Sequence, residues 1–273
     1  MNNSTNPSDN GSTIDESVNS VLFEVQDHIG TITINRPKKM NALRLKEFDS
    51  LIRHLNDADK NSDVHVILIR SSGNRAFSGG LDLNMVRQFT PEDVPKLLQH
   101  GNDTVRAILQ AKKPVVVEVQ GPAVAWGTIL CLAADFVIAG ENPKTFFSLP
   151  EIDIGLFPAT GALTLALFSL GFRRAKRILM IPEKISLKKA EEFGIVTQIC
   201  PIDSLEKMAI QFCQNLASKP QGILIPIKAL INNFHIQNLE QYFDKEAEML
   251  ELSMSGDQNK MDEFIERLWK IEK

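Results

Sequence analysis

The stretch VEVQGPAVAWGTILCLAADFVIAG, residues Val117 to Gly140, places a strand, a sharp bend and an apolar helix in immediate succession. The strand ends the run VVVEV (Val115–Val119), whose β-branched residues are typical of a strand buried on both faces. In the bend QGPAVAWG, Trp126 stands where close approach of the backbone favours a small residue. The helix that follows, through Ile129–Ala134, carries no charged group at Ile129. The rest of the chain explains both features.

The alternation of strand and helix continues on both sides of this stretch, which predicts an α/β fold of stacked βαβ units. Another run of β-branched residues, VHVILI (Val64–Ile69), indicates a second strand buried on both faces. We further expect a hairpin of Val21–Val25 and Thr31–Asn35 around the turn Asp27–Gly30, helices over Leu45–Ala58 and within Pro91–Ala111, and a strand over Phe136–Ala139.

After Thr160 the pattern changes to a series of helices. These are Gly161–Leu170, Arg173–Met180, Ser186–Phe193, Asp203–Ser218, Ile223–Asn233, Leu239–Leu250 and Asp257–Lys270, with one short strand at Ile195–Ile199. The expected organisation is therefore a disordered tail over residues 1–20, an α/β core over 21–200 and a helical C-terminal region over 201–273.

Composition excludes several classes of function. A formal net charge of −4 over 273 residues provides no broad cationic surface, so we expect no nucleic-acid partner. No apolar run approaches the roughly 20 residues of a membrane span, so we expect no membrane partner. The cysteines Cys131, Cys200 and Cys213 show neither CxxC nor Cys/His spacing, which indicates buried thiols of a reducing compartment and no metal site.

The two ends of the chain carry no targeting signal that we recognise. The first 20 residues are rich in Asn and Ser and contain no Lys or Arg, unlike a secretory or mitochondrial leader. The last three residues, Ile271 to Lys273, are not a peroxisomal signal. The cytoplasm is the expected location.

Two bends between a buried strand and a helix are the candidate chemical sites. One is RAFSGGLDL (Arg75–Leu83), and the other is QGPAVAWG (Gln120–Gly127). Main-chain N–H groups at a helix start are unpaired and lie at the positive end of the helix dipole. Two such groups directed at one carbonyl oxygen would form an oxyanion hole. The alternative is that the glycines only permit tight turns.

Four motifs together resemble the crotonase superfamily, the enoyl-CoA hydratase/isomerase family. They are NRPKKMNAL (Asn35–Leu43), AFSGGLDL (Ala76–Leu83), QGPAVAWGTILCLAAD (Gln120–Asp135) and LPEIDIGLFP (Leu149–Pro158), in the family's order and spacing. The resemblance extends from about Val21 to about Asn233. It implies a spiral of ββα units, a helical C-terminal trimerisation region and an acyl-CoA thioester substrate, with coenzyme A as part of the substrate and no separate cofactor.

The resemblance assigns the two oxyanion N–H groups to Leu81 and Trp126. Leu81 follows Gly79 and Gly80, and alanine is frequent at the position of Gly79. Ala125 and Trp126 replace two glycines of the family's pattern, so the bend must accommodate their Cβ atoms. Because Trp126 contributes only its main-chain N–H, its side chain is free to point elsewhere and shape the acyl pocket.

Counting along the motifs puts the family's two catalytic glutamates at Ile129 and Glu151, so one carboxylate is missing. Hydration needs two acid–base groups, whereas the Δ3,Δ2-enoyl-CoA isomerases of the family move a proton with a single base. Ile129, Trp126 and Phe157 would exclude water, and desolvation would raise the pKa of Glu151. A hydratase, another lyase or hydrolase, and a non-catalytic CoA-ester binder remain alternatives, although Ala159 stands where the hydrolases carry an acid.

The family binds coenzyme A largely through main-chain groups, here near Met40, Ala42 and Leu43. Lys38, Lys39, Arg44 and, from a neighbouring subunit, Lys228 are candidate contacts of the phosphates, with a solvated surface role as the alternative. Asp82 lies at the edge of this site and is expected to cap the next helix.

The apolar residues of the segments Ile223–Asn233 and Leu239–Leu250 exceed what a terminal helical extension usually hides. With the habit of the family added, we expect a homotrimer or a dimer of trimers. The alternative is that these helices fold back onto their own core.

Overall fold

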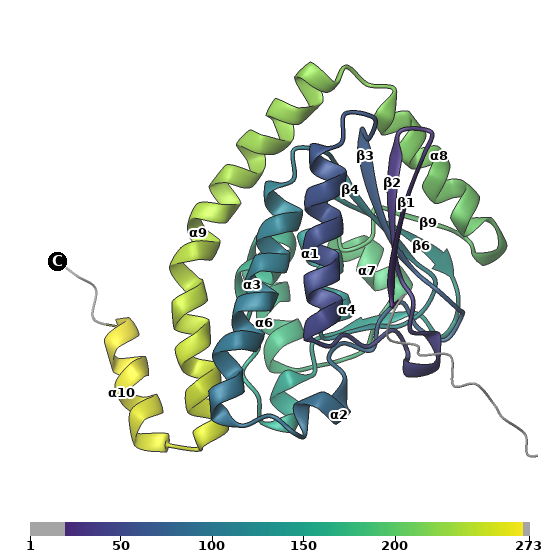
Figure 1. The fold of residues 1–273 in the computed structure, drawn as a ribbon. Helices are drawn as coiled ribbons and strands as arrows, with labels where there is room; N and C mark the ends of the chain where they lie inside the picture. Colours follow the sequence, from purple (N-terminus) through teal and green to yellow (C-terminus); the bar gives the residue numbers. More distant parts are fainter. Residues whose placement is uncertain (1–19, 270–273) are drawn as a thin grey trace, which may run out of the picture.

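The computed structural model describes residues 20–269, so the expected tail at 1–20 lies outside the described residues, Ser20 excepted. A six-stranded sheet with the order β1-β2-β3-β4-β6-β9 forms the centre (Figure 1). Its strands are β1 Val21–Gln26, β2 Ile29–Ile34, β3 Val66–Ser71, β4 Val115–Val119, β6 Phe136–Glu141 and β9 Gln198–Pro201. β1 and β2 form the expected antiparallel hairpin, and the other neighbours are parallel.

Helices cover both faces of this sheet. α1 (Leu45–Lys60), α3 (Val94–Gln110) and α4 (Trp126–Ala133) lie on one side, and α8 (Leu205–Ala217) lies on the other (Figure 1). Along β3, Ile67 and Ile69 belong to the larger hydrophobic cluster, whereas Val66 and Leu68 belong to the cluster under α8. The expected α/β fold with strands buried on both faces is therefore confirmed.

A second, three-stranded sheet consists of β5 (Ala123–Val124), β7 (Phe146–Ser148) and β8 (Ile185–Ser186). Sequence analysis did not predict it, because strands of two or three residues have no measurable periodicity. β5 lies inside the bend QGPAVAWG and pairs in parallel with β7, with Val124 opposite Ser148. Because β5 and β7 are parallel, the chain segments that follow them emerge at the same end of this sheet.

The remaining helices largely match the expected ranges. They are α2 Leu83–Val86, α5 Ala162–Leu170, α6 Phe172–Met180, α7 Leu187–Phe193, α9 Gln221–Ser255 and α10 Gln258–Trp269, and short 3-10 turns lie at Pro37–Lys39, Pro91–Asp93, Glu151–Ile154 and Ile202–Ser204. The secondary-structure elements described after β9, which ends at Pro201, are all helices.

One expectation was wrong: α9 is a single helix, where two helices were predicted. Residues 234–238 contain neither glycine nor proline, so nothing ends the helix there. Pro226 is accommodated near its start. The helix runs along the outside of the molecule and buries one face against α3 and α5 (Figure 1).

Candidate active site

The two bends lie side by side and are hydrogen-bonded to each other. Phe77 N donates to Pro122 O over 3.0 Å, and Val124 N donates to Ser78 O over 2.9 Å. A Cβ atom at Gly80 would lie 2.9 Å from Ala125 Cβ and 3.5 Å from Trp126 N. Glycine is therefore required at this close approach, and its φ of 87° also favours glycine.

Both bends present a main-chain N–H group without an acceptor among the described residues. Around Leu81, the neighbouring groups are paired: Leu43 N donates to Gly80 O, and Asp82 N donates to Leu43 O. Trp126 is the first residue of α4, so the helix itself provides no acceptor for its N–H. Within the described part of the chain, the N–H groups of Leu81 and Trp126 have no acceptor. These are the two residues to which the resemblance assigned the oxyanion N–H groups.

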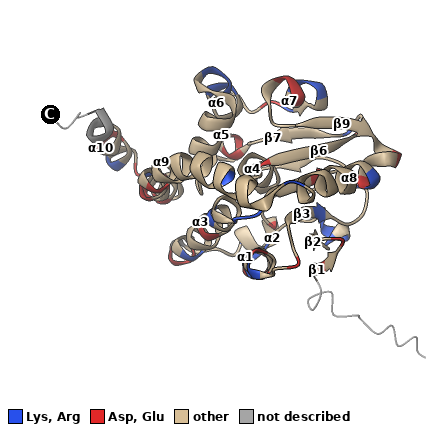
Figure 2. Cartoon of the chain, turned by 90° about the horizontal axis from the view of Figure 1, so that it is seen from above, with Lys and Arg blue, Asp and Glu red and all other residues tan. Residues whose placement is uncertain are grey.

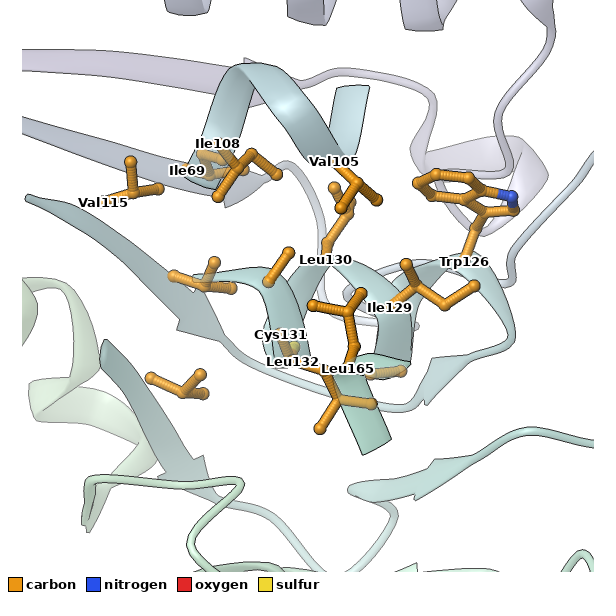
Figure 3. Packing of buried hydrophobic residues seen from close by; sticks show 14 of the residues in the cluster. Ile69, Val105, Ile108, Val115, Trp126, Ile129, Leu130, Cys131, Leu132 and Leu165 are labelled. Atoms are coloured by element: carbon orange, nitrogen blue, oxygen red, sulfur yellow. The ribbon is translucent and has the colours of Figure 1, made fainter. Parts of the chain in front are cut away.

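The Trp126 side chain points away from these donors into the core. It is 4% exposed, and its ring meets Phe48 of α1 edge-on, with 4.7 Å between the centroids. In Figure 3 the indole lies in one packed cluster with Val105 of α3 and with Ile129 of its own helix. The side chain was expected to turn away from the donor and shape the acyl pocket. In this structure it belongs to the hydrophobic core.

Ala125, the residue before this donor, has a strained backbone. Its φ and ψ are 50° and −115°, a region that a side chain with a Cβ atom rarely adopts. Its N–H donates to Ser148 O of β7 over 2.8 Å, which holds the bend against the second sheet. Ala125 thus maintains a conformation for which the family's pattern has glycine.

We expect Ala125→Gly to raise the free energy of unfolding by about 1 kcal/mol, because glycine removes the strain at φ 50° and only part of that gain is lost to its freer unfolded state. Urea denaturation measures the change. Ala123→Gly, in β5, is the control and should destabilise the protein. A loss of stability in Ala125→Gly would show that the strain is not significant.

Glu151 follows the strand that pairs with the second bend. It begins the 3-10 turn that follows β7, and the parallel pairing of β5 with β7 directs the segments carrying Trp126 and Glu151 the same way. Its Oε2 is buried and has no hydrogen-bond partner, and burial raises the pKa of Glu151 to about 7. A carboxyl with one unpartnered oxygen and this pKa is suited to accept a proton near neutral pH.

The position of the second family glutamate is apolar in three dimensions as well. Ile129 is 2% exposed and lies in the main hydrophobic cluster. Phe157 and Leu156 pack against a small cluster of Val94, Leu98, Ala159 and Leu250. Asp153, two residues after Glu151, is exposed. Glu151 is therefore the carboxylate that the motifs leave for proton transfer.

The loop expected to hold coenzyme A is anchored by Asn41, which the sequence analysis missed. Met40 and Asn41 both have positive φ values, 51° and 53°. The buried Asn41 amide donates to Ser72 O over 2.9 Å and to Ala76 O over 3.0 Å, and Ser78 Oγ donates to Asn41 O over 3.0 Å. One side chain therefore ties the loop of Met40, Ala42 and Leu43 to the first bend. The short polar side chain of asparagine at a left-handed position was the available signal.

Asp82 has the expected capping role. Its carboxylate accepts from Asn84 N at the start of α2 over 3.1 Å and pairs with Arg36 over 2.9 Å. Arg36 also donates to Ala42 O, and the guanidinium helps to hold the pKa of Asp82 below its usual range despite the opposing effect of burial. Gly79 has room for a methyl group, since a Cβ atom there would lie 3.5 Å from Met40 Cβ.

Lys228 requires a correction. We expected a solvated side chain or a contact to the neighbour's coenzyme A phosphates, but its Nζ is buried 2.7 Å from Asp135 Oδ2. It also donates to Lys113 O over 2.8 Å and Ile108 O over 3.3 Å, and Asn232, one turn later, donates to Leu109 O over 2.9 Å. Both side chains satisfy carbonyl groups at the end of α3, which explains why they face inward.

Among residues 20–269, no group of three or more His, Cys, Asp and Glu side chains has the geometry to hold a metal ion. No helix in that range is long and apolar enough to cross a membrane. Basic and acidic segments alternate over the outer helices in Figure 2.

Comparisons with known proteins place the chain. Residues 24–270 match the family model described as enoyl-CoA hydratase/isomerase. The trans-2-decenoyl-[acyl-carrier-protein] isomerase of Streptococcus mutans is 29% identical, over 84% of this chain and 88% of its own length. The mitochondrial enoyl-CoA hydratase of Pongo abelii is 33% identical, over 75% and 69%. The crystal structure of an enoyl-CoA hydratase from Mycobacterium avium subsp. paratuberculosis K-10 has 30% identity and a TM-score of 0.79, over 87% and 94%.

The chain therefore belongs to the enoyl-CoA hydratase/isomerase family, and its fold is that of the crotonase superfamily. The relatives named above include an isomerase and hydratases. Membership thus establishes an enzyme of this family and leaves the particular reaction open.

Proposed function

We propose that the protein is an enoyl-thioester isomerase that moves a double bond from C3 to C2 with Glu151 as its only acid–base group. Two observations together support this most: the Oε2 atom of Glu151 is buried without a hydrogen-bond partner, and the second catalytic position of the family holds the apolar Ile129. Hydration requires one group to activate water and another to handle the proton on carbon, whereas isomerisation reuses one base.

The proposed reaction proceeds through a thioester enolate. The thioester oxygen accepts hydrogen bonds from the N–H groups of Leu81 and Trp126, which stabilise the negative charge that develops on it. Glu151 takes a proton from C2, the electrons of that C–H bond form a dienolate with the C3=C4 bond, and the protonated Glu151 returns the proton to C4. The product is the conjugated 2-enoyl thioester. Coenzyme A is part of the substrate, and the mechanism uses no separate cofactor.

Turnover by the wild-type protein tests the proposal. With trans-3-hexenoyl-CoA we expect the ultraviolet absorbance of the conjugated thioester to rise, and with crotonyl-CoA we expect almost no loss of that absorbance through hydration. Rapid hydration of crotonyl-CoA would favour the hydratase alternative. Tight binding of saturated acyl-CoA without turnover of any thioester in a panel would favour the non-catalytic binder. Because the Streptococcus mutans relative is named for a carrier-protein substrate, a 3-decenoyl chain should be offered on both carriers.

Restoring a glutamate at position 129 should not produce a hydratase. Ile129→Glu would place a carboxylate in a core position that is 2% exposed, so we expect a loss of about 3 kcal/mol or more in the free energy of unfolding and no gain in hydration. Ile129→Leu is the control and should keep both stability and isomerase activity. Thermal denaturation and the crotonyl-CoA assay measure the two effects. A stable variant that hydrates crotonyl-CoA would contradict the assignment of Ile129 to the core.

We also propose that the chain assembles as a homotrimer or a dimer of trimers. The outer face of α9 exposes large apolar side chains, with Leu230 at 75%, Ile231 at 66% and Phe234 at 64% exposure. A cavity of about 760 Å³ lies along this helix and is lined in part by Ile227 and Ile231. Apolar surface of this extent supports an interface between copies of the chain.

Light scattering after size-exclusion chromatography measures the assembly. We expect a trimer or hexamer for the wild type and smaller species for Leu230→Glu, because a charge at the centre of an apolar interface is left unpaired. Glu251→Lys, on an exposed position of the same helix, is the control and should assemble normally. A wild-type monomer at micromolar concentration would refute the assembly.

A further inference from the structure

Gly101 lies in the middle of α3, a position where glycine is less favourable than alanine. The space beside it is already occupied. A methyl group at this position would lie 2.5 Å from Thr160 Cγ2 and 2.7 Å from Trp126 Cζ2. The absence of a side chain therefore forms a notch in α3 that holds the edge of the Trp126 indole and the methyl group of Thr160.

The two side chains in the notch come from the two halves of the proposed active site. Trp126 carries one of the two free N–H groups, and Thr160 lies on the segment that follows Glu151. Both segments are strained at this point. Ala125 has a φ of 50°, and Thr160 has a φ of 60°, which is rare for a β-branched residue. Such conformations persist only where the surrounding structure enforces them.

The contacts of both side chains show how the notch enforces these conformations. The indole is clamped between Phe48 of α1, with 4.7 Å between ring centroids, and the notch at Gly101. On the other segment, Thr160 is 5% exposed, and the next N–H, that of Gly161, donates to Glu246 Oε2 over 2.6 Å. The Trp126 segment is thus held between Phe48 and α3, and the Thr160 segment is held between Glu246 and α3.

We infer that Gly101 is a positioning residue, whose notch holds the Trp126 indole and the Thr160 methyl group against α3 and so sets the placement of the second bend relative to the segment of Glu151. This inference rests on the proposed function of Trp126 and Glu151. It also explains how the chain tolerates Ala125 and Trp126 where its family's pattern has glycines. The buried Trp126 side chain holds the bend in the conformation that glycine residues would adopt without strain. Proton transfer is sensitive to such placement, since an error of about 1 Å costs about 100-fold in rate.

The test is Gly101→Ala, combined with changes that empty the notch. The added methyl group must displace the indole or Thr160, so we expect kcat for trans-3-hexenoyl-CoA to fall about 10-fold or more, with a smaller change in KM. Thr160→Ser removes the closest atom, Cγ2, and Trp126→Phe removes Cζ2. We expect either change, made in Gly101→Ala, to recover part of kcat. Gly222→Ala is the matched control, because Gly222 is also a helical glycine but has no atom within 4 Å of a Cβ position.

Fluorescence reports the notch without reference to activity. Trp126 and Trp269 are the two tryptophans of the chain, so Trp126 is observed alone in a Trp269→Phe background. Gly101→Ala should shift its emission, and Thr160→Ser should reverse the shift. If Gly101→Ala does not fold, Thr160→Ser alone keeps the test: it loosens the notch and should lower kcat while the free energy of unfolding changes little.

The outcomes separate this inference from the proposed function. A wild-type protein that isomerises no enoyl thioester would refute the proposed function. The non-additive effect of Gly101→Ala and Thr160→Ser could still be measured, from the free energy of unfolding and from calorimetry of octanoyl-CoA binding. Wild-type kcat and emission in Gly101→Ala, or a loss that Thr160→Ser and Trp126→Phe do not relieve, would overturn the notch. If Thr160→Ser or Trp126→Phe restored the free energy of unfolding of Gly101→Ala but not its kcat, Gly101 would have only a packing role.

Discussion

Replacing Glu151 by glutamine is expected to lower kcat for isomerisation of trans-3-hexenoyl-CoA by about 10²- to 10⁴-fold, the usual contribution of a general base. Glutamine has the same shape but cannot accept the proton from C2. Binding should persist, because the proposed contacts to coenzyme A are main-chain groups near Met40 and Ala42. Calorimetry with octanoyl-CoA measures binding, and the absorbance assay measures turnover. Asp153→Asn, on the same turn but exposed, is the control and should leave kcat unchanged.

The pH dependence of wild-type kcat/KM is a second test of the role of Glu151. Burial raises the pKa of Glu151 to about 7, and only the ionised form is a base. The value of kcat/KM should therefore rise with pH, by about tenfold per unit below the pKa, and level off above it. An exposed glutamate, with a pKa near 4.5, would give a flat profile at neutral pH. Full activity of Glu151→Gln, or such a flat profile, would contradict the assignment.

The parts of the site that the sequence predicted are those whose residues lie close together along the chain. The backbone geometry of Leu81 and of Trp126 is set by a strand-to-helix bend. A few consecutive residues determine each bend. Asp82 likewise caps the helix that begins at the next residue. The unpaired N–H groups and the helix cap depend on local backbone geometry, so counting along the motifs of the resembling family was sufficient to locate them. The action of Leu81 and Trp126 on a thioester oxygen stays a prediction.

The parts that sequence analysis missed depend on contacts between distant segments. Gly101 in α3 reads as an ordinary helical glycine until Trp126 and Thr160 are found against it. Lys228 reads as a surface lysine, yet its partners are Asp135 and carbonyl groups at the end of α3. The side chain of Trp126 was expected to shape the acyl pocket, and its packing against Phe48 and α3 places it in the core. No periodicity encodes which long-range partner a side chain meets.

Glu246 is a further case of this kind, and the structure assigns it a role in stability. It lies on the inner face of α9, is 1% exposed, and its Oε2 accepts from Gly161 N over 2.6 Å. Hydrogen bonds from the N–H groups of Leu163 and Thr164 also oppose the rise in its pKa. Gly161 is the N-cap residue of α5 and has no side chain, so Glu246 supplies the capping oxygen from a distant helix.

Removing this oxygen should be costly. Glu246→Leu leaves buried N–H groups at the start of α5 without an acceptor, so we expect the free energy of unfolding to fall by about 3 kcal/mol or more. Glu246→Gln keeps an acceptor oxygen, and its loss should be smaller. Glu251→Gln, at an exposed position of the same helix, is the control and should have no measurable effect. Urea denaturation compares the four proteins, and equal stability of Glu246→Leu and the wild type would refute the capping role.

The wild type and Glu246→Gln also test how the free energy of unfolding depends on pH. Burial raises the pKa of Glu246 from 4.5 to about 8, so folding favours its protonated form. The stabilisation from this group is complete below pH 4.5, where both states are protonated, and is lost as the pH rises from 4.5 to about 8, because the unfolded chain ionises first. Relative to Glu246→Gln, the wild type should therefore lose on the order of a few kcal/mol across this interval. Glu118 and Glu151, whose pKa burial also raises to about 7, titrate in both proteins and cancel in the difference. Parallel curves of unfolding free energy against pH would show that Glu246 is already ionised in the folded protein.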